Sequence, residues 1–458
     1  MLSFLLSLSL AQINSVPPPS TEIIEKQEVR PLPGRLDSIP VFNSNSPELI
    51  LEEGILLSTF PKKGKKHKNA HLNFPFQGRF DIFAHHVAKA ATPEDLRSLY
   101  LGVIVHNPGE SPVKVNILHA GTYLSQPDAP FIDLPDQRNN LFGTVYAGPG
   151  SRVTNDILRN HRQSIFPPQL IIPAGESRML LNLPIPVKEL DPPINGRSTL
   201  MRLRTDGTIY VASLAMFAPK NEDESERSPT LAEWQNLLKN GELSSPRDKA
   251  PTLPENTKKP IIYGRVAGVS QGSEWKASLT DNPQVKYLTI PDPGQVLSYG
   301  ISTLHRGTLG TKQIQSAPML RRYPDTAYYA HGNYGVHYNL HLPLHNKTEK
   351  PQTVLLSVQT PIKEDTLSQK GLRFLKTPRK RVFFRGTVRV RYNDRQGISR
   401  TKYVHLVQNR GEKARKLVRV NLKPNSKEFV KVDFLYPPDA TPPQVLTIET
   451  MKSVHPIE

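Results

Sequence analysis

Three histidines, His337, His341 and His345, recur at every fourth position of the stretch GVHYNLHLPLHN. Histidine is a common zinc ligand and a general acid or base near neutral pH. The stretch also alternates polar and apolar residues, the pattern of a half-buried β-strand. Residues four apart on a strand are separated by about 13 Å, whereas zinc holds histidine nitrogens at about 2.0–2.1 Å. Two of these histidines therefore cannot bind one zinc ion, and we expect a strand with a polar face. A metal site would need further ligands, such as His85, His86 or His331.

Other stretches offer weaker catalytic signals. GVSQG (268–272) has the G-x-S-x-G spacing of a nucleophile elbow, which needs a strand before it and a helix after it. The residues that follow are too short and broken for that helix, so we interpret the glycines as turn residues. Asp128, Asp133 and Asp136 are scattered in a Pro-rich loop, and no pair stands out for glycoside hydrolysis, which needs two carboxyl groups about 5–10 Å apart. We assign no catalytic residue, metal ligand or cofactor.

Composition favours many short strands. The 458 residues include 44 prolines, roughly twice the usual share of about 5%, and proline disfavours long helices and long central strands. The chain has no cysteine, which excludes disulfides, zinc ribbons, iron–sulfur clusters and thiol nucleophiles. The sequence predicts an all-β protein with two β-sandwich domains, one or two short helices and Pro-rich loops.

The N-terminus has the pattern of a signal peptide. An apolar run from Leu2 to Leu10 is followed by Ala11, and Ser9 and Ala11 are the small residues that signal peptidase requires. The run is too short to span a membrane. The absence of cysteine suits a chain that folds in an oxidising compartment. We therefore expect cleavage after Ala11 and a periplasmic or extracellular location.

Strand patterns fill two regions that are separated by a polar segment. In that segment TLAEWQNLLKNG predicts a helix that begins after Thr230, with Glu233 completing a capping box and Gly241 as the stop. A second helix is predicted within 151–162, capped by Ser151 or Thr154. The predicted organisation is a signal peptide (1–11), an extended N-terminal segment (12–58), a first β-sandwich (59–218), a polar linker with a short helix (219–258) and a second β-sandwich with a basic surface (259–458).

The two strand-rich regions share a motif. His106-Asn107, Glu110 and Pro112 recur 239 residues later as His345-Asn346, Glu349 and Pro351. A later alternating strand matches at an offset of 251, as in the pair Leu181 and Val432. Asparagine at a strand end can hydrogen-bond its own backbone and start a turn. The match predicts two sandwiches related by duplication.

Charge is concentrated in one segment. Residues 370–423 hold eighteen Lys or Arg and two acids, a net charge of +16 out of +18 for the whole chain. The segment predicts a hairpin around Asn393–Gly397, with Arg385, Arg389 and Arg391 on one face and exposed to solvent. Localised basic surfaces attract polyanions. The alternative is a solvated basic face that only maintains solubility. The candidate polyanion-binding residues are Arg379, Lys380, Arg381, Arg385, Arg389, Arg391, Arg400 and Lys402.

Several long stretches resemble a family of exported cyanobacterial proteins of unknown function. They are VRPLPGRLDSIPVFNSNSPELI, YGRVAGVSQGSEW, YAHGNYGVHYNLHLPLHN and YPPDATPPQVLTIET, and the resemblance covers nearly the whole mature chain. It implies export and a photosynthetic bacterial source, and it brings no catalytic residues.

Two functions remain open. The first is an exported, non-catalytic envelope protein that binds or organises an acidic surface polymer, either polysaccharide or lipid headgroups, with peripheral membrane contact as one form of this binding. The second is a carbohydrate-active or other hydrolytic enzyme of an unrecognised type. Because the chain is expected to be exported, nucleic acid is not an expected partner.

Overall fold

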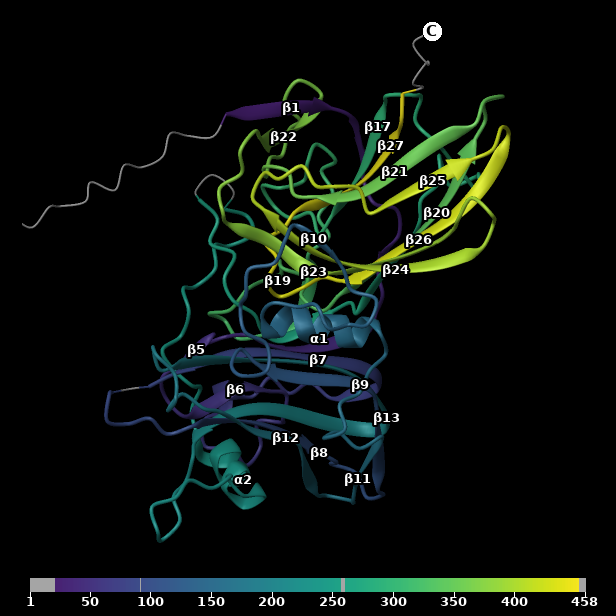
Figure 1. Ribbon diagram of the computed structural model, residues 1–458. Helices are drawn as coiled ribbons and strands as arrows, with labels where there is room; N and C mark the ends of the chain where they lie inside the picture. The colour runs from purple at the N-terminus through teal and green to yellow at the C-terminus, as the bar shows by residue number, and fades with distance from the viewer. Residues whose placement is uncertain (1–20, 91, 257–259, 453–458) are drawn as a thin grey trace, which may run out of the picture.

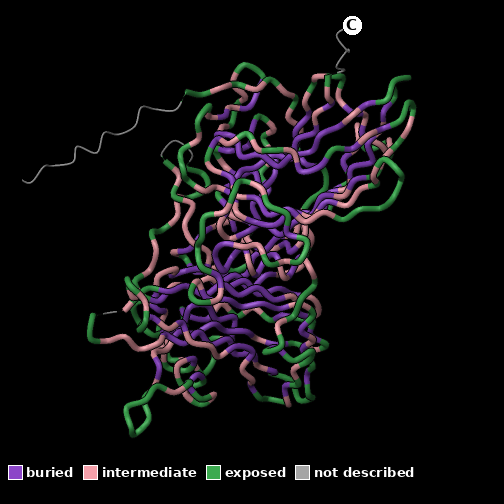
Figure 2. The backbone as a smooth tube through the Cα atoms, viewed as in Figure 1, coloured by how far each residue is buried: buried purple, intermediate pink, exposed green. Residues whose placement is uncertain are grey.

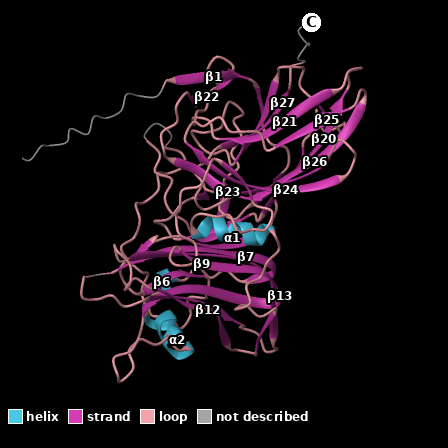
Figure 3. Ribbon diagram, in the orientation of Figure 1, coloured by secondary structure: helices cyan, strands magenta, loops and turns pink. Residues whose placement is uncertain are grey.

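A computed structural model describes residues 21–90, 92–256 and 260–452. Strands dominate, and the described chain has two α-helices, α1 (Pro149–Leu158) and α2 (Leu231–Asn240), beside a short 3-10 turn (Lys68–Ala70). The strands form two stacked sandwich-like halves (Figure 3). The predicted all-β class is confirmed, whereas the predicted signal peptide at 1–11 lies outside the described residues.

The first half is built around one very long strand, β13 (Ile194–Phe217). Residues 194–205 of β13 pair with β7 and β9, and residues 210–217 pair with β8. The pairing register with β7 shifts between Thr205 and Ile209, so β13 contributes to both layers of the sandwich. The other strands of this half are β4 (Pro40–Ser44), β5 (Leu49–Ile50), β6 (Gly54–Ser58), β7 (Phe76–Lys89), β8 (Leu99–His106), β9 (Val113–Leu124), β11 (Gln169–Ile172) and β12 (Ser177–Ile185).

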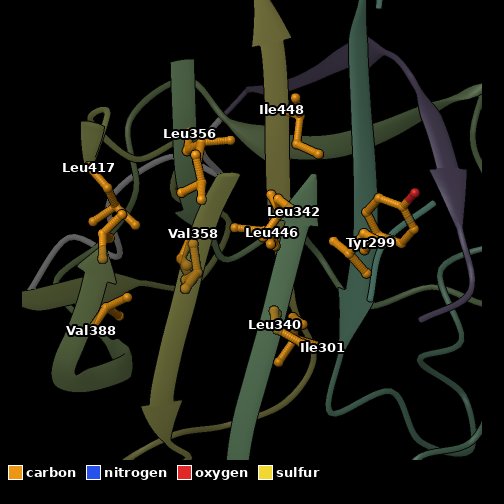
Figure 4. Close-up of a cluster of buried hydrophobic side chains, with 14 of the residues drawn as sticks. Tyr299, Ile301, Leu340, Leu342, Leu356, Val358, Val388, Leu417, Leu446 and Ile448 are labelled. Carbon is orange, nitrogen blue, oxygen red and sulfur yellow. The ribbon is translucent and has the colours of Figure 1, made fainter. Parts of the chain in front are cut away.

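The second half packs two sheets face to face. Their strand orders are β24-β23-β26-β20-β15 and β17-β27-β21-β25. Alternation along β20 sends Leu340 and Leu342 into the core, beside Ile301 and Leu446 of the facing sheet (Figure 4). The strands are β15 (Glu274–Ser278), β16 (Leu288–Thr289), β17 (Val296–Ile301), β20 (His337–Asn346), β21 (Gln352–Gln359), β22 (Gly371–Leu375), β23 (Val382–Asn393), β24 (Ser399–Asn409), β25 (Val418–Leu422), β26 (Ser426–Leu435) and β27 (Gln444–Thr450).

The two halves are interleaved in sequence. The N-terminal strands β1 (Glu22–Lys26), β2 (Glu28–Arg30) and β3 (Arg35–Leu36) pair with β22, β17 and β15 of the second half. Conversely, β14 (Ala267–Gln271) pairs with β4 and β18 (Ala317–Arg322), and β18 pairs with β19 (Tyr329–Ala330), so all three extend the first half. A short strand of the first half, β10 (Gln137–Asn139), adds to β24. The sheets therefore cross the boundaries that composition predicts at residues 58 and 258.

The repeated motif occupies equivalent places in the two halves. Strand β8 pairs with β12 as β20 pairs with β26, and β9 pairs with β11 as β21 pairs with β25. His106 lies opposite Ser177, and His345 lies opposite Lys427. This register gives an offset of 250 at Ser177, but a bulge between Met179 and Leu181 reduces it to 249 at Leu181, whose counterpart is Val430. The predicted offset of 251 is therefore two residues too large at Leu181. The prediction aligned two prolines in the preceding loops, whereas the pairing of strands fixes the true correspondence.

Asparagine makes the same turn in both halves, as predicted. The side-chain nitrogen of Asn107 donates to the carbonyl oxygen of Ser111 at 2.7 Å, and the amide of Gly109 donates to its side-chain oxygen at 2.9 Å. Asn346 makes the matching bonds to Lys350 at 2.8 Å and from Thr348 at 3.0 Å. Each asparagine thereby satisfies the backbone groups that its turn leaves unpaired.

Helix α2 confirms its predicted caps. The side chain of Thr230 accepts from the amide of Glu233, and the Glu233 carboxylate accepts from the amide of Thr230. Its buried Trp234 lies on Gly102 of β8, where a Cβ atom would come within 2.8 Å of the indole ring. The helix therefore packs on the first half.

Helix α1 lies between the two halves (Figure 1). It contacts β9 and β13 on one side and β23 and β26 on the other, and buried residues continue through this junction (Figure 2). It begins at Pro149 after Gly148, which has no side chain to cap the helix, so the predicted caps Ser151 and Thr154 are wrong. Proline at the first helical position is favoured because its missing amide would have had no partner there.

Candidate functional site

The predicted basic hairpin exists. Strands β23 and β24 pair from Val382 to Asn409, with the turn near Asp394 and Gly397. Arg385, Arg389 and Arg391 lie on one face of β23, and Val388 and Val390 are buried in the core on the other. The predicted alternation is confirmed.

The predicted exposure to solvent is wrong for Arg385 and Arg389, because their end of this face turns toward the first half, whereas the side chain of Arg391 is 38% exposed. Arg389 donates to the backbone carbonyl of Leu158, at the end of α1, at 3.1 Å, and its side chain is 15% exposed. Arg385 lies over the ring of Phe131, 5.2 Å from its centroid. The sequence shows which residues share a face, but it does not show that another part of the chain covers that face.

The other predicted residues do not join these arginines in one patch. Cross-strand pairing places Lys402 beside Val390 and Arg400 beside Tyr392, on the face opposite Arg389. The Lys402 Nζ atom donates to the carbonyl oxygen of Leu417 at 2.8 Å.

The three bases before β23 lie in the loop that leads into that strand. The Lys380 Nζ atom is 2.6 Å from Asp133, and both side chains are exposed. Arg381 lies over the ring of Phe383, and its amide donates to the carbonyl of Arg379.

Asp433 binds basic side chains on the same sheet face as Arg389, at the end that the first half covers. This fully buried carboxylate on β26 lies 3.1 Å from both Nε2 of His337 and Nε of Arg389, and 3.3 Å from Arg391. Burial alone would raise the pKa of Asp433, but the hydrogen bonds from His337 and Arg389 hold it well below its ordinary value. Asp433 therefore remains an anion that neutralises part of the predicted basic cluster.

The uncovered end of the same face carries bases on four adjacent strands. His341 of β20 pairs with Lys431 of β26, which pairs with Arg391 of β23. Lys276 of β15 lies one row away, and Lys427 lies farther along β26. We call these five residues the basic face. Neighbouring strands are about 4.8 Å apart, so the face is about 15 Å wide.

The pKa values show that these charges act on one another. Burial lowers the pKa of His341, and the nearby Lys431, Lys276 and Arg391 lower it further. Burial also lowers the pKa of Lys431, and Arg391 adds to this shift. A bound anion would relieve this mutual repulsion.

Aromatic rings accompany the bases. Phe429 is 68% exposed and lies between Lys427 and Lys431 on the same face of β26. Tyr287 lies beneath two ammonium groups, 5.0 Å from Lys427 and 4.9 Å from Lys347, and its ring meets the edge of His345. The face can therefore combine charge attraction with stacking against an apolar surface.

The three histidines of GVHYNLHLPLHN lie on this polar face of β20, as predicted. His337, His341 and His345 are each half-buried on one side of β20, and the core leucines occupy the other. His337 lies at the covered end beside Asp433, whereas His341 lies among the bases.

Sequence reasoning missed most of the basic face. The basic segment of the sequence ends at Lys423, whereas Lys427 and Lys431 lie just beyond it and Lys276 lies far away in sequence. The alternation of Lys427, Phe429 and Lys431 in SKEFVKVDFL was the available signal.

The serine of GVSQG does not occupy a nucleophile elbow. Ser270 lies inside strand β14 and is 2% exposed, and the strand β15 follows it. The turn comes at Gly272, which has a positive φ of 115° and packs against Leu36. The interpretation of GVSQG as a turn is therefore corrected to a strand that ends in a turn. Within the described residues, no helix is both long and apolar enough to cross a membrane.

The fold and this face define an all-β protein of two interleaved sandwiches with a basic, partly aromatic sheet surface. Residues 27–450 match the family described as "Protein of unknown function (DUF3370)", and the chain belongs to that family. No curated protein matches the chain.

Two solved structures show only faint similarity. Lac15 from a marine microbial metagenome is 10% identical with a TM-score of 0.11; the alignment covers 83% of this chain and 54% of Lac15, so this chain spans about half of that protein. The 11S allergen from Cocos nucifera is 9% identical with a TM-score of 0.12, over 82% of this chain and 88% of the allergen. Similarities at this level carry no argument about function.

Proposed function

We propose that this chain is an exported, non-catalytic protein of the cyanobacterial cell envelope that binds or organises an acidic polymer on its basic face. The observation that carries the proposal is the row of His341, Lys431 and Arg391 on three adjacent strands, with Lys276 and Lys427 beside it. The row crosses three adjacent strands on one surface of the sheet, which suits an extended chain of anionic groups.

The composition of the face favours acidic polysaccharide over lipid headgroups as the polymer. Phe429 provides an exposed ring between two lysines, and a sugar ring presents both an apolar face and, when oxidised, a carboxylate. Each charge contact between exposed groups is weak, so affinity comes from several contacts made together. Such binding falls steeply with salt, because the screening length decreases from about 10 Å at 0.1 M to about 3 Å at 1 M.

Export rests on the sequence. The apolar run from Leu2 to Leu10, the small residues Ser9 and Ala11, and the complete absence of cysteine support a mature chain that begins at Gln12 and works outside the cytoplasm. The cyanobacterial source rests on the resemblance of the long stretches given above. Duplication of one ancestral sandwich is a further part of this proposal, supported by the matching strand pairings and turns in the two halves.

The alternative of a hydrolytic enzyme gains no support from Asp95 and Glu224, two of the five carboxylates that line a pocket of about 1330 Å³. Hydrogen bonds from Arg97 lower the pKa of Asp95, and a hydrogen bond from Lys220 lowers the pKa of Glu224. A general acid in glycoside hydrolysis needs a raised pKa instead. These two carboxylates have the protonation behaviour of surface ion pairs.

The test removes three charges of the basic face in one variant, K276Q/K427Q/K431Q. We expect it to elute from an immobilised acidic polysaccharide at clearly lower salt than the unaltered chain. The matched control is K62Q/K63Q/K66Q, which removes three lysines from an exposed loop elsewhere. The control should elute near the unaltered chain. Equal elution of the two folded variants, checked by circular dichroism, would refute the basic face as the binding site.

A further inference from the structure

A polar pocket lies between the two halves, at a different place from the basic face. It has a volume of about 490 Å³ and is lined by residues of both halves. Asn45 and Arg265 come from the segments around β4 and β14, and Lys363 comes from the loop between β21 and β22. Tyr263 and Tyr334 add two aromatic side chains to the lining.

Lys363 supplies a cation with unused hydrogen-bonding capacity. Its Nζ atom donates to the hydroxyl of Tyr263 and lies 4.3 Å from the centroid of that ring. An ammonium has three donors, and within the described residues the remaining two have no partner. None of the ion pairs found among the described residues involves Lys363, although the nearby Asp365 attracts its charge. Burial lowers the pKa of Lys363 to about 8, so it is mostly protonated at pH 7.

Asn45 supplies an acceptor that lacks a donor. Its side chain is 5% exposed, and its Oδ1 atom is buried with no hydrogen-bond partner in the described structure. A buried polar atom without a partner is costly, and such atoms are normally satisfied by protein, water or a ligand. A hydroxyl group bound in the pocket would provide that donor.

The aromatic residues of the lining are fixed in place. The hydroxyl of Tyr263 donates to the carbonyl oxygen of His305 at 2.7 Å. The hydroxyl of Tyr334 donates to the carbonyl oxygen of Ala440 at 3.2 Å. His331 meets the edge of the Tyr263 ring at 4.7 Å. Burial lowers the pKa of His331 to about 3, so it stays neutral. The charged residues of the lining are Lys363, Lys249, Arg265 and Asp248, and Asp248 accepts a hydrogen bond from Ser46. Arg265 is already paired with Glu48.

We propose that this pocket binds one carboxylated sugar residue, such as a uronic acid, at the end of a polysaccharide or as a free sugar acid. The carboxylate is held by Lys363, a ring hydroxyl donates to Oδ1 of Asn45, and the apolar face of the sugar packs against the tyrosines. The volume suits one or two sugar rings rather than a polymer segment. This inference goes beyond the proposed function, because the pocket shares no residue with the basic face.

The test measures binding of short saccharides by isothermal titration calorimetry with the full chain. The probes are trigalacturonate, monomeric galacturonate and the neutral trisaccharide of galactose. We expect the acidic probes to bind at least tenfold more tightly than the neutral one at pH 7. If trigalacturonate binds much more tightly than the monomer, the ligand is the end of a polysaccharide. If the two bind with equal affinity, the ligand is a free sugar acid. Both outcomes support the pocket. Equal binding of the acidic and neutral trisaccharides, or binding of neither, overturns the proposal.

Two variants assign the contacts. K363M should lose at least tenfold in affinity for galacturonate, and its residual binding should not change between pH 7 and 9, whereas binding by the unaltered chain weakens above pH 8. N45A should lose affinity for all three probes. The matched control K376M, which removes an exposed lysine outside the pocket, should bind as the unaltered chain does. Unchanged galacturonate binding by folded K363M overturns the assignment.

The variant K276Q/K427Q/K431Q separates this proposal from the proposed function. This variant should bind trigalacturonate as the unaltered chain does, even though it binds the immobilised acidic polysaccharide less tightly. A loss of trigalacturonate binding in that variant, with K363M unaffected, would place the sugar acid on the basic face and overturn the pocket assignment.

Discussion

The guanidinium of Arg389, on β23, donates at 3.1 Å to the backbone carbonyl of Leu158, at the C-terminal end of α1. The same guanidinium binds Asp433, which also accepts from His337. A charged side chain of the second half thus stabilises a helix end of the first, where carbonyl groups lack intrahelical partners and carry partial negative charge. The junction is a hydrogen-bonded assembly, and its polar groups depend on one another.

Asp433→Asn should therefore destabilise the protein strongly. The substitution leaves Arg389 buried without its anion, and breaking a buried pair in this way costs about 3–5 kcal/mol. The measurement is the midpoint of urea unfolding. Asp394→Asn is the matched control, because Asp394 pairs with the exposed Arg400 at the hairpin turn and its loss should change the midpoint little. Similar midpoints for the two variants would contradict the role of Asp433.

Stability should fall as pH decreases from about 6.5 to about 4. His86 is fully buried, with hydrogen bonds to Ser44 at 2.9 Å and to the carbonyl of Pro47 at 2.8 Å, and burial lowers its pKa to about 4. In this window the unfolded chain binds a proton that the folded chain does not, so stability is fully present above 6.5 and is lost toward 4. One such histidine contributes about 3 kcal/mol across the window.

His86→Gln tests whether His86 causes this pH dependence. The quantity to compare is the change of stability with pH, and not the stability at one pH. The variant should show a shallower decrease in melting temperature between pH 7 and 4.5. His161→Gln, at an exposed position, should keep the slope of the unaltered chain. An unchanged slope in His86→Gln would show that another group causes the pH dependence.

Gly102→Ala should loosen helix α2. A Cβ atom at this position would lie 2.8 Å from the indole of Trp234, and overpacking of a filled core costs about 1–3 kcal/mol. Thermal unfolding measures the loss. In a Trp234→Leu background the same glycine substitution should cost clearly less, because the clashing ring is gone. An equal cost in both backgrounds would point to a backbone effect instead.

Phe429 and Lys431 should contribute differently to polymer binding. Phe429→Ser removes an exposed ring, so it should weaken retention without changing the slope of log affinity against log salt. Lys431→Gln should reduce that slope, because fewer counterions are released on binding. Phe142→Ser, at another exposed phenylalanine, should leave retention unchanged. A reduced salt slope in Phe429→Ser would contradict this division of roles.

Local patterns predicted the features that depend on neighbouring residues. Alternation placed the histidines of β20 on one face, and the capping box placed the start of α2 at Leu231. The shared His-Asn motif identified equivalent turns at Asn107 and Asn346. Each of these features is decided within a few residues, by side-chain direction or by a local hydrogen bond.

Features that depend on distant contacts were not predictable in this way. The burial of Arg389 is caused by α1, and the partner of that arginine, Asp433, is contributed by another strand. The basic face assembles Lys276, His341 and Lys431 from three strands whose adjacency no local pattern states. The interleaving of the halves likewise becomes visible only when the pairing partners of β2 and β14 are known.

This interleaving sets an order in which the fold can be completed. Strand β1 must wait for β22, and β2 must wait for β17 and β27, whose residues are made hundreds of positions later. A chain that emerges N-terminus first therefore holds β3 unpaired until residue 275 has emerged, β2 until residue 297 and β1 until residue 371. The second half therefore cannot be completed early, and the first half, whose main strands pair within residues 54–217, receives its edge strands β14 and β18 only later.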